Sequence, residues 1–307
     1  MTPAQLSRTV LHTVRRAVEA DELCVDVPER VKVRIPPRGG CGDYATNVAL
    51  QLARGRGEGA AARIAEVLRR RLVEAPGIAG VDIAGPGFLN ITLDARSHEQ
   101  LVEAILEQGD GYGLGGGLAG VHARFAPADE VRAALVLHAV VGLVEGCGGS
   151  VDVGVGGEVI SVRAAGGDAR ELLTRLGSDA ARWGLLRAAA HDLPDLDPAH
   201  LLAQREGNPL FRVRYAHAVT HRSVDEGDEG VEGLDDLVLL GLLGDFPRTV
   251  EAAARHRSPD RLARHLVAVA DAYLGQADNR RKRLAEATRV VLANGLRLLG
   301  ISAPKRL

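Results

Sequence analysis

The stretch GVDIAGPGFLNITL (residues 80–93) contains two short, mostly apolar runs separated by a Gly-Pro-Gly sequence. Runs of this length that are rich in Val, Ile, Phe and Thr are typical of β-strands. Glycine and proline in succession are typical of a turn. The stretch therefore predicts two short strands around a turn, with Phe88 and Asn90 at the start of the second strand.

The first twenty residues predict an amphipathic helix. Thr2, Pro3 and Gln5 supply an N-cap, a proline at the first helical position and a capping-box partner. An apolar stripe follows at helical spacing, which indicates one buried face. The stripe consists of Leu6, Val10, Leu11, Val14 and Val18.

Segments on both sides of the predicted hairpin complete an α+β domain over residues 1–112. VKVRIPP (31–37) predicts a short strand that ends at prolines, and GDYATNVALQLARG (42–55) predicts a helix capped by Asp43. Two further amphipathic helices are expected, since apolar residues recur at helical spacing in both segments. They are AARIAEVLRRRLVEA (61–75) and SHEQLVEAILEQGDG (97–111).

A glycine-rich stretch, GDGYGLGGGLAG (109–120), has the composition of a linker. After it, residues 122–167 predict a strand, a helix and a strand, which is at most one or two βαβ-like units. We expect residues 113–169 to form this linker and a reduced α/β segment.

From residue 170 to residue 307 the pattern is helical and predicts an all-α bundle. Asp197-Pro198 and Ser258-Pro259 are typical helix starts. The acidic run SVDEGDEGVEGLDD (223–236) predicts an exposed loop within the bundle. The expected fold is therefore an α+β domain, a reduced α/β segment and a helical bundle.

Composition narrows the classes of function. The net charge of −2 provides no overall basic field for nucleic acid, and no apolar run is long enough to span a membrane. Cys24, Cys41 and Cys147 are widely spaced, so they predict neither a zinc site nor a disulfide framework. The N-terminus lacks the apolar core of a signal peptide, and we expect a cytoplasmic protein.

The stretch RYAHAVTHR (214–222) places His217 and His221 one helical turn apart. Such a pair can bind zinc, but it needs a third ligand and usually a nearby acid. No glutamate lies between the two histidines and no nucleophile accompanies them. We therefore expect no metal and no cofactor here, and packing and RNA contact both stay open as roles.

Both ends of the chain resemble arginyl-tRNA synthetases. GDYATNVALQLAR (42–54) and GIAGVDIAGPGFLNITL (77–93) resemble the N-terminal additional domain of that family. Three further segments resemble its helical anticodon-binding domain. They are LGSDAARWGLLR (176–187), NPLFRVRYAHA (208–218) and ATRVVLANGLRLLGISAPKRL (287–307).

The catalytic domain of that family lies between these two ends, and here only about 60 residues occupy its place. The segment PADEVRAA (127–134) resembles the region of the paired histidines, yet it has no histidine and adds Glu130. VISVRAAGGDARELL (159–173) resembles the lysine loop, but Val162 stands where a lysine would be. The resemblance implies a relative that does not catalyse, and Arg124, Arg132 and Arg163 are too scattered to act as substitutes.

The resemblance also implies RNA contacts. In the family, the turn and strand that correspond to GPGFLN meet the tRNA elbow, where an aromatic ring stacks on a base and an amide pairs with a base edge. Arginines in the helical domain are candidates for phosphate contacts. The candidate RNA-binding residues are Phe88, Asn90, Asn47, Arg212, Arg214, Tyr215, His217, Arg281 and Lys282.

We therefore expect a protein that binds tRNA, with tRNA-Arg as the candidate, or that modulates a synthetase or another protein. We expect neither a membrane nor DNA as a partner. An interaction module that has lost RNA binding is the first alternative, since the net charge is close to zero and GQADNRRKR (275–283) lacks the aromatics usual there. A residual or partner-completed ligase is the second.

Overall fold

A computed structural model describes residues 1–36, 41–226, 236–275 and 282–307. The chain divides into two compact units. Unit 1 comprises Met1–Ala104 and Glu232–Asp245, and unit 2 comprises Ile105–Val231 and Phe246–Leu307. This confirms the expected fold class, which is α+β at the N-terminus with helices at the C-terminus. The domain limits at residues 112 and 169 stay predictions.

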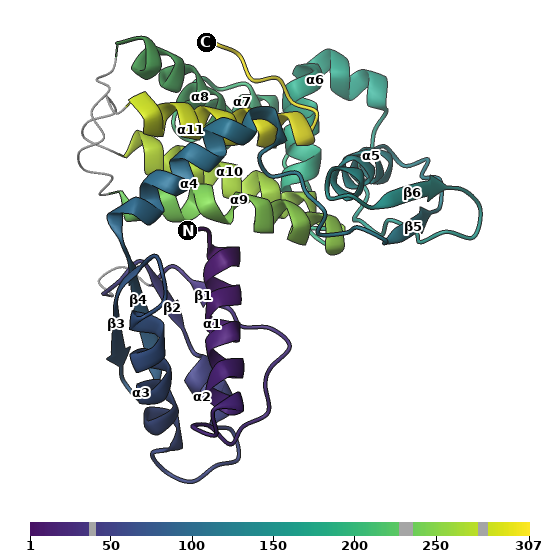
Figure 1. Ribbon diagram of the computed structural model, residues 1–307. Helices are drawn as coiled ribbons and strands as arrows, with labels where there is room; N and C mark the ends of the chain where they lie inside the picture. The colour runs from purple at the N-terminus through teal and green to yellow at the C-terminus, as the bar shows by residue number, and fades with distance from the viewer. Residues whose placement is uncertain (37–40, 227–235, 276–281) are drawn as a thin grey trace. The chain divides into compact units, whose positions relative to one another are not determined.

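Unit 1 contains a four-stranded antiparallel sheet in the order β1-β2-β4-β3 (Figure 1). Alternate residues of β4 are buried, which is the pattern of a strand with one covered face. The four strands are β1 (Val33–Arg34), β2 (Tyr44–Thr46), β3 (Ile78–Ala84) and β4 (Phe88–Leu93).

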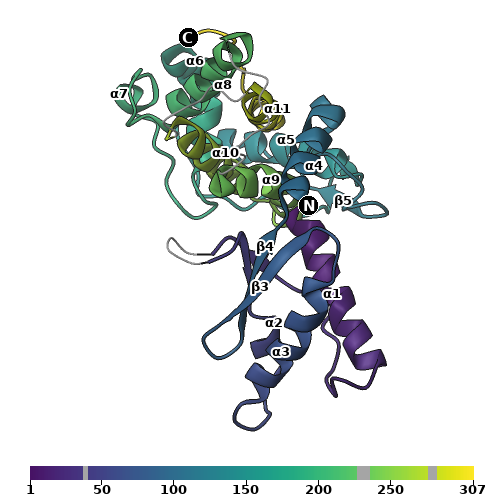
Figure 2. The same ribbon diagram turned by 60° about the vertical axis from the view of Figure 1, so that its left-hand side comes forward.

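Helices cover one face of this sheet (Figures 1 and 2). Their apolar stripes pack against Leu89 and Ile91 of β4, both of which are fully buried. Burial of such side chains is the main term that stabilises the unit. The helices of unit 1 are α1 (Pro3–Glu19), α2 (Val48–Leu52) and α3 (Ala60–Val73), with the first part of α4 (Ala95–Gln108) and of α9 (Leu237–Arg255).

Two local predictions are confirmed. At the start of α1, the Thr2 side chain accepts a hydrogen bond from the Gln5 N–H and the Gln5 side chain accepts one from the Thr2 N–H, which completes the capping box. The hairpin turn between β3 and β4 uses positive φ angles at Gly85 (55°) and Gly87 (145°). Side chains rarely adopt such angles, so the turn requires glycine at these positions.

The predicted role of Asp43 as a helix cap is wrong. Residues Tyr44–Thr46 form strand β2, and α2 begins only at Val48. The buried Asp43 carboxylate accepts a hydrogen bond from the Leu93 N–H at 2.7 Å, so it ties the end of β4 to the start of β2. The helical periodicity of 42–55 was outweighed by this pairing of β2 with β4.

Unit 2 combines a βαβ element with a helical bundle. The strands β5 (His122–Phe125) and β6 (Ser150–Val153) are parallel neighbours, and helix α5 (Val131–Gly146) connects them. This is the short parallel sheet expected for residues 122–167. The bundle helices are α6 (Ala169–Arg187), α7 (Pro198–Leu201), α8 (Pro209–Glu226), α10 (Pro259–Leu274) and α11 (Lys282–Leu298), with the second part of α9.

The glycine-rich segment 109–120 is packed rather than a linker. It begins with a short 3-10 helix, η1 (Gly109–Gly111), and the side chains of Tyr112 and Leu118 are almost fully buried. The Asn294 side chain of α11 donates hydrogen bonds to the carbonyl oxygens of Gly109 and Tyr112, both at 2.9 Å. Composition alone missed these contacts because the partner lies more than 180 residues away.

Glycines shape α6 and its surroundings. Gly177 has a φ of 73° inside α6, which kinks the helix there. Gly184 packs so closely on the following segment that a Cβ atom would lie 2.9 Å from the Asp195 carbonyl oxygen. This close approach lets residues 195–201 lie directly against the helix.

Candidate functional site

The face of the unit 1 sheet opposite the helices carries a row of side chains from all four strands. The strand register pairs Arg34 with Ala45, Ala45 with Asn90, and Asn90 with Asp82. Directly paired residues project to the same face of a sheet. We call this face, with Arg34, Ala45, Asn90, Asp82 and Phe88, the open sheet face.

Phe88 lies on this face and is not a core residue. Its side chain is 42% exposed, whereas the neighbouring Leu89 is fully buried. Asn47 directly follows Thr46, whose strand partner is Leu89, so Asn47 lies at the same end of the sheet as Phe88. The three candidate residues of the N-terminal domain, Phe88, Asn90 and Asn47, are thus brought close together.

The side chains of Asn47 and Asn90 differ in whether they are free to bond to a partner molecule. The Asn47 side-chain oxygen accepts a hydrogen bond from Gln51 at 2.9 Å. Within the described residues, the Asn90 amide group has no side-chain hydrogen bond, and it is half-buried. The amide of Asn90 can therefore bond to a partner without first breaking a contact.

Sequence reasoning did not identify Arg34 and Asp82 as neighbours of Asn90. Arg34 is exposed at the β1 end of the row and Asp82 is exposed at the β3 end. Such a row offers a cation for a phosphate and, next to the amide, a carboxylate that accepts hydrogen bonds from base N–H groups. Only the strand register joins these residues, and the sequence does not encode it in any short motif.

In unit 2, the candidate residues of α8 divide into buried and exposed ones. His217 is 3% exposed, and its Nδ1 donates a hydrogen bond to the Pro304 carbonyl oxygen at 2.9 Å. The ring of His221 packs edge-on against it, with centroids 5.0 Å apart. Tyr215 is 41% exposed and stacks on Phe211. His217 therefore holds the C-terminal segment on α8, whereas Tyr215 is accessible.

Arg212 and Arg214 each form an ion pair within the bundle. Arg212 pairs with Asp271 of α10, and the Arg214 guanidinium lies 3.7 Å from the Asp179 carboxylate of α6. Arg214 also donates a hydrogen bond to the Ser302 hydroxyl at 3.3 Å. Phosphate contact by either arginine would compete with these acidic partners.

The remaining candidates give less information. Lys282 is the first residue of α11, and Arg281 lies outside the described residues, as do residues 227–235 of the acidic run. In the part of the chain that the structure describes, no three His, Cys, Asp or Glu side chains converge as a metal site requires. No described helix combines the length and the apolar character needed to cross a bilayer.

The histidine pair predicts a pH-dependent stability. Burial lowers the pKa of both His217 and His221, and for His221 the nearby Arg289 acts in the same direction. Below the ordinary histidine pKa of about 6.5, the unfolded chain therefore binds protons that the folded chain does not. The free energy of unfolding should fall as the pH drops through this region.

His217→Asn should flatten this pH dependence, because the substitution removes the buried titrating group of the pair. Urea unfolding between neutral pH and pH ~5.5 measures the slope. His191→Asn is the matched control, since His191 is exposed and lies outside the histidine pair of α8. An identical slope in His217→Asn and in the unaltered protein would contradict this assignment.

The middle segment is organised by one buried guanidinium. Arg132, near the start of α5, is completely buried, and its five N–H groups donate to five backbone carbonyl oxygens at 2.7–3.1 Å. An arginine side chain has five N–H donors in total, so none remains for a ligand. The acceptors are the carbonyl oxygens of Arg163, Leu185, Ala188, Ala189 and Asp192.

Glu130 occupies the N-terminus of α5. Its carboxylate accepts hydrogen bonds from the Ala133 N–H at 2.8 Å and from the Ala165 N–H at 3.0 Å. These bonds outweigh desolvation and keep the pKa of Glu130 below its usual value. A helix N-terminus attracts anions, and here a side chain of the protein itself fills that position and binds segment 159–168.

Comparisons with known proteins agree with this architecture. A family model described as "Arginyl tRNA synthetase N terminal domain" matches residues 5–93, and one described as "DALR anticodon binding domain" matches residues 214–307. The fold is similar to the arginyl-tRNA synthetase of Thermus thermophilus, with a TM-score of 0.73, 13% identity and 100% of both chains covered. That of Plasmodium falciparum gives 0.69, with 8% identity and 99% of both chains covered.

Curated relatives are more similar in sequence over shorter stretches. The arginine–tRNA ligase of Renibacterium salmoninarum is 47% identical over 123 residues, which are 39% of this chain and 22% of that protein. The enzyme of Clavibacter sepedonicus is 35% identical over 164 residues, 45% of this chain and 30% of that one. The chain thus spans less than a third of the length of these relatives. The two family models match the two ends of the chain, which therefore carries an arginyl-tRNA synthetase N-terminal domain and a DALR anticodon-binding domain.

Proposed function

We propose that this protein binds tRNA, with tRNA-Arg as the first candidate, and does not itself charge it. The observation that carries the proposal is the open sheet face, where an exposed aromatic ring and an unpaired amide lie together within a synthetase-type N-terminal domain. Phe88 would stack on an unpaired base, and Asn90 would bond to a base edge. We place this binding in the cytoplasm, where aminoacylated tRNA is used.

Three features support the absence of catalysis. The carboxylate of Glu130 fills the N-terminus of α5. All five donors of Arg132 are used by backbone carbonyl oxygens, and no lysine occurs between Lys32 and Lys282. Adenylate formation develops negative charge on phosphate oxygens, and fixed cations and donors must stabilise that charge. The residues at these positions are instead committed to the fold.

Arginine-dependent ATP–pyrophosphate exchange tests this second part of the proposal. We expect the purified chain to give the same background exchange with and without arginine, because the charges at the α-phosphate are missing. A full-length arginyl-tRNA synthetase in the same assay is the positive control. Exchange above background that requires both arginine and this chain would contradict the proposal.

A protein-interaction module is the second candidate function. It is favoured by exposed valines at the end of β6 and in the segment after it, and by the ion pairs that occupy Arg212 and Arg214. A protein partner, such as a synthetase, would cover these valines. They are Val153, Val155 and Val159, which are 53%, 89% and 72% exposed.

Gel shift with native tRNA distinguishes the two functions. If the protein binds tRNA, a retarded complex forms and unlabelled tRNA competes it away. If the protein is only an interaction module, no shift appears at any protein concentration up to that used for the positive-control synthetase. The second result would favour the interaction module.

A further inference from the structure

A cleft of about 620 Å³ opens in unit 2 between the C-terminal end of α6, the loop after it, α7 and the N-terminus of α8. Its walls lie outside the open sheet face and outside the segment around Glu130. The loop 188–192 forms one wall, and Arg132 fixes that loop from behind by bonding to the carbonyl oxygens of Ala188, Ala189 and Asp192. The wall of the cleft is therefore held in place by hydrogen bonds within the fold.

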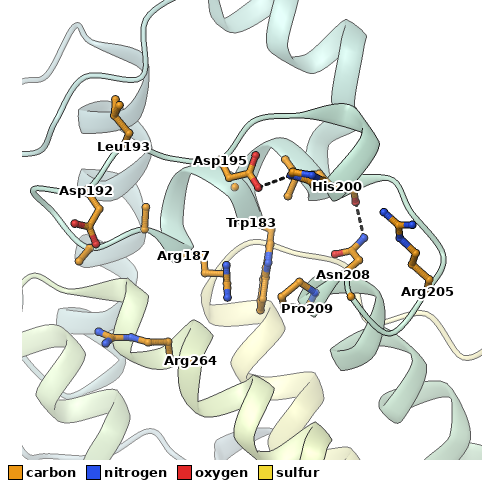
Figure 3. A pocket seen from close by; sticks show the side chains of 15 residues that line it. Trp183, Arg187, Asp192, Leu193, Asp195, His200, Arg205, Asn208, Pro209 and Arg264 are labelled. Atoms are coloured by element: carbon orange, nitrogen blue, oxygen red, sulfur yellow. Dashed lines mark hydrogen bonds and ion pairs between the residues drawn. The ribbon is translucent and has the colours of Figure 1, made fainter.

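Trp183 contributes an unsatisfied donor to this cleft. The residue is 1% exposed, and its indole Nε1 has no acceptor among the described residues. Figure 3 shows the ring standing between the guanidinium of Arg187 and Pro209. A buried N–H without an acceptor is unfavourable by about 1–3 kcal/mol. Native proteins rarely leave such a group without a partner, which a bound molecule or an ordered water can supply.

Two arginines of the cleft are free to bind an anion. Arg187 at the end of α6 and Arg205 before α8 are both exposed, and neither forms an ion pair within the described residues. Arg264 also lines the cleft but pairs with Asp260. The start of α8 adds no donor of this kind, because Pro209 has no N–H and the Leu210 N–H already donates to the Asn208 side-chain oxygen at 3.0 Å.

The acidic groups of the cleft have partners of their own, although Asp195 is also close enough for the Arg187 charge to help lower the pKa of its carboxyl group. The Asp195 carboxylate is held by His200 Nδ1 at 2.9 Å and by the Asp197 N–H at 3.1 Å. Asp192 lies at the opposite side of the cleft from Arg205, as Figure 3 shows. Arg187, Trp183 and Arg205 thus remain on the lining of the cleft as hydrogen-bond donors without an acceptor among the described residues.

From these observations we infer that the cleft binds a phosphate group, held by Arg187 and Arg205 with the Trp183 N–H as an additional donor. Guanidinium groups bind phosphate through charge-assisted, often paired hydrogen bonds, which suits two unpaired arginines at one opening. Free phosphate and the backbone of a bound RNA present the same chemistry. The inference does not require the proposed tRNA binding.

Trp183 is the only tryptophan of the chain, so its fluorescence reports on this cleft alone. Titration with inorganic phosphate at constant ionic strength should give a saturable change in tryptophan emission. Arg187→Ala or Arg205→Ala should each weaken the apparent affinity about ten-fold, because one charged contact is lost. Arg175→Ala is the matched control, since Arg175 is an exposed α6 arginine that does not line the cleft.

The absence of a saturable change in tryptophan emission would overturn the inference. An equal loss of apparent affinity in the two arginine variants and in the control would overturn it as well. The source of the phosphate is found by adding tRNA to the phosphate-bound protein. If tRNA displaces phosphate, the RNA backbone occupies the cleft. If tRNA leaves the phosphate isotherm unchanged, the cleft binds a free phosphate, and a failure of tRNA binding elsewhere would not affect this result.

Discussion

Arg132→Met is expected to destabilise the protein by about 3–5 kcal/mol, because it leaves five buried carbonyl oxygens without their donor. These carbonyl groups lie in α6, in the loop after it and in segment 159–168, so all three would lose their common anchor. Domains of this kind are stable by only about 5–15 kcal/mol. The variant should therefore unfold at a clearly lower urea concentration.

Urea unfolding monitored by the emission of Trp183, which lies beside the affected loop, measures this loss. Arg124→Met is the matched control, because Arg124 lies on β5 in the same segment and is exposed. Arg132→Lys should fall between the two, since lysine keeps the charge but has three donors instead of five. Equal midpoints for Arg132→Met and Arg124→Met would show that the buried arginine does not organise the segment.

Phe88→Ala is expected to weaken tRNA binding about ten-fold or more, since stacking on an unpaired base contributes about 1–3 kcal/mol. The fold should survive, because the side chain is 42% exposed and leaves no cavity in the core. The difference in affinity between tRNA-Arg and an unrelated RNA should also become smaller. Filter binding at several salt concentrations separates this effect from phosphate contacts, which depend more strongly on salt.

Val73→Ala provides the matched control for Phe88→Ala. Val73 lies in the same unit on α3 and is also 42% exposed, but it is not on the open sheet face. Its substitution should leave the affinity for tRNA unchanged. If Phe88→Ala binds tRNA as tightly as Val73→Ala does, Phe88 does not stack on a base and the elbow contact must be abandoned.

The parts of the fold that depend on residues a few positions apart in the sequence could be predicted from the sequence. The capping box of Thr2 and Gln5 and the turn at Gly85 and Gly87 are set by local geometry, and both are present. Asp43 was assigned wrongly because its partner, the Leu93 N–H, is 50 residues away. The packing of segment 109–120 was missed for the same reason, since Asn294 lies in the last helix.

In the candidate site, too, the residues that lie close together in the sequence could be predicted and the distant partners could not. Phe88 and Asn90 could be identified from one short stretch, whereas Arg34 and Asp82 join them only through the strand register. For Arg214, the sequence did not reveal that Asp179 of a different helix would pair with it. The cleft around Trp183 draws its walls from residues 183–209 and Arg264, and no short motif marks that arrangement.

Competition binding tests the central claim, that the protein recognises tRNA, most directly. Labelled tRNA-Arg is bound to the full chain at physiological salt and displaced with unlabelled tRNA-Arg, with another tRNA or with an unstructured RNA of equal length. The proposed function predicts saturable binding that both tRNAs displace more readily than the unstructured RNA. Absence of saturable binding, or equal displacement by all three RNAs, would contradict it.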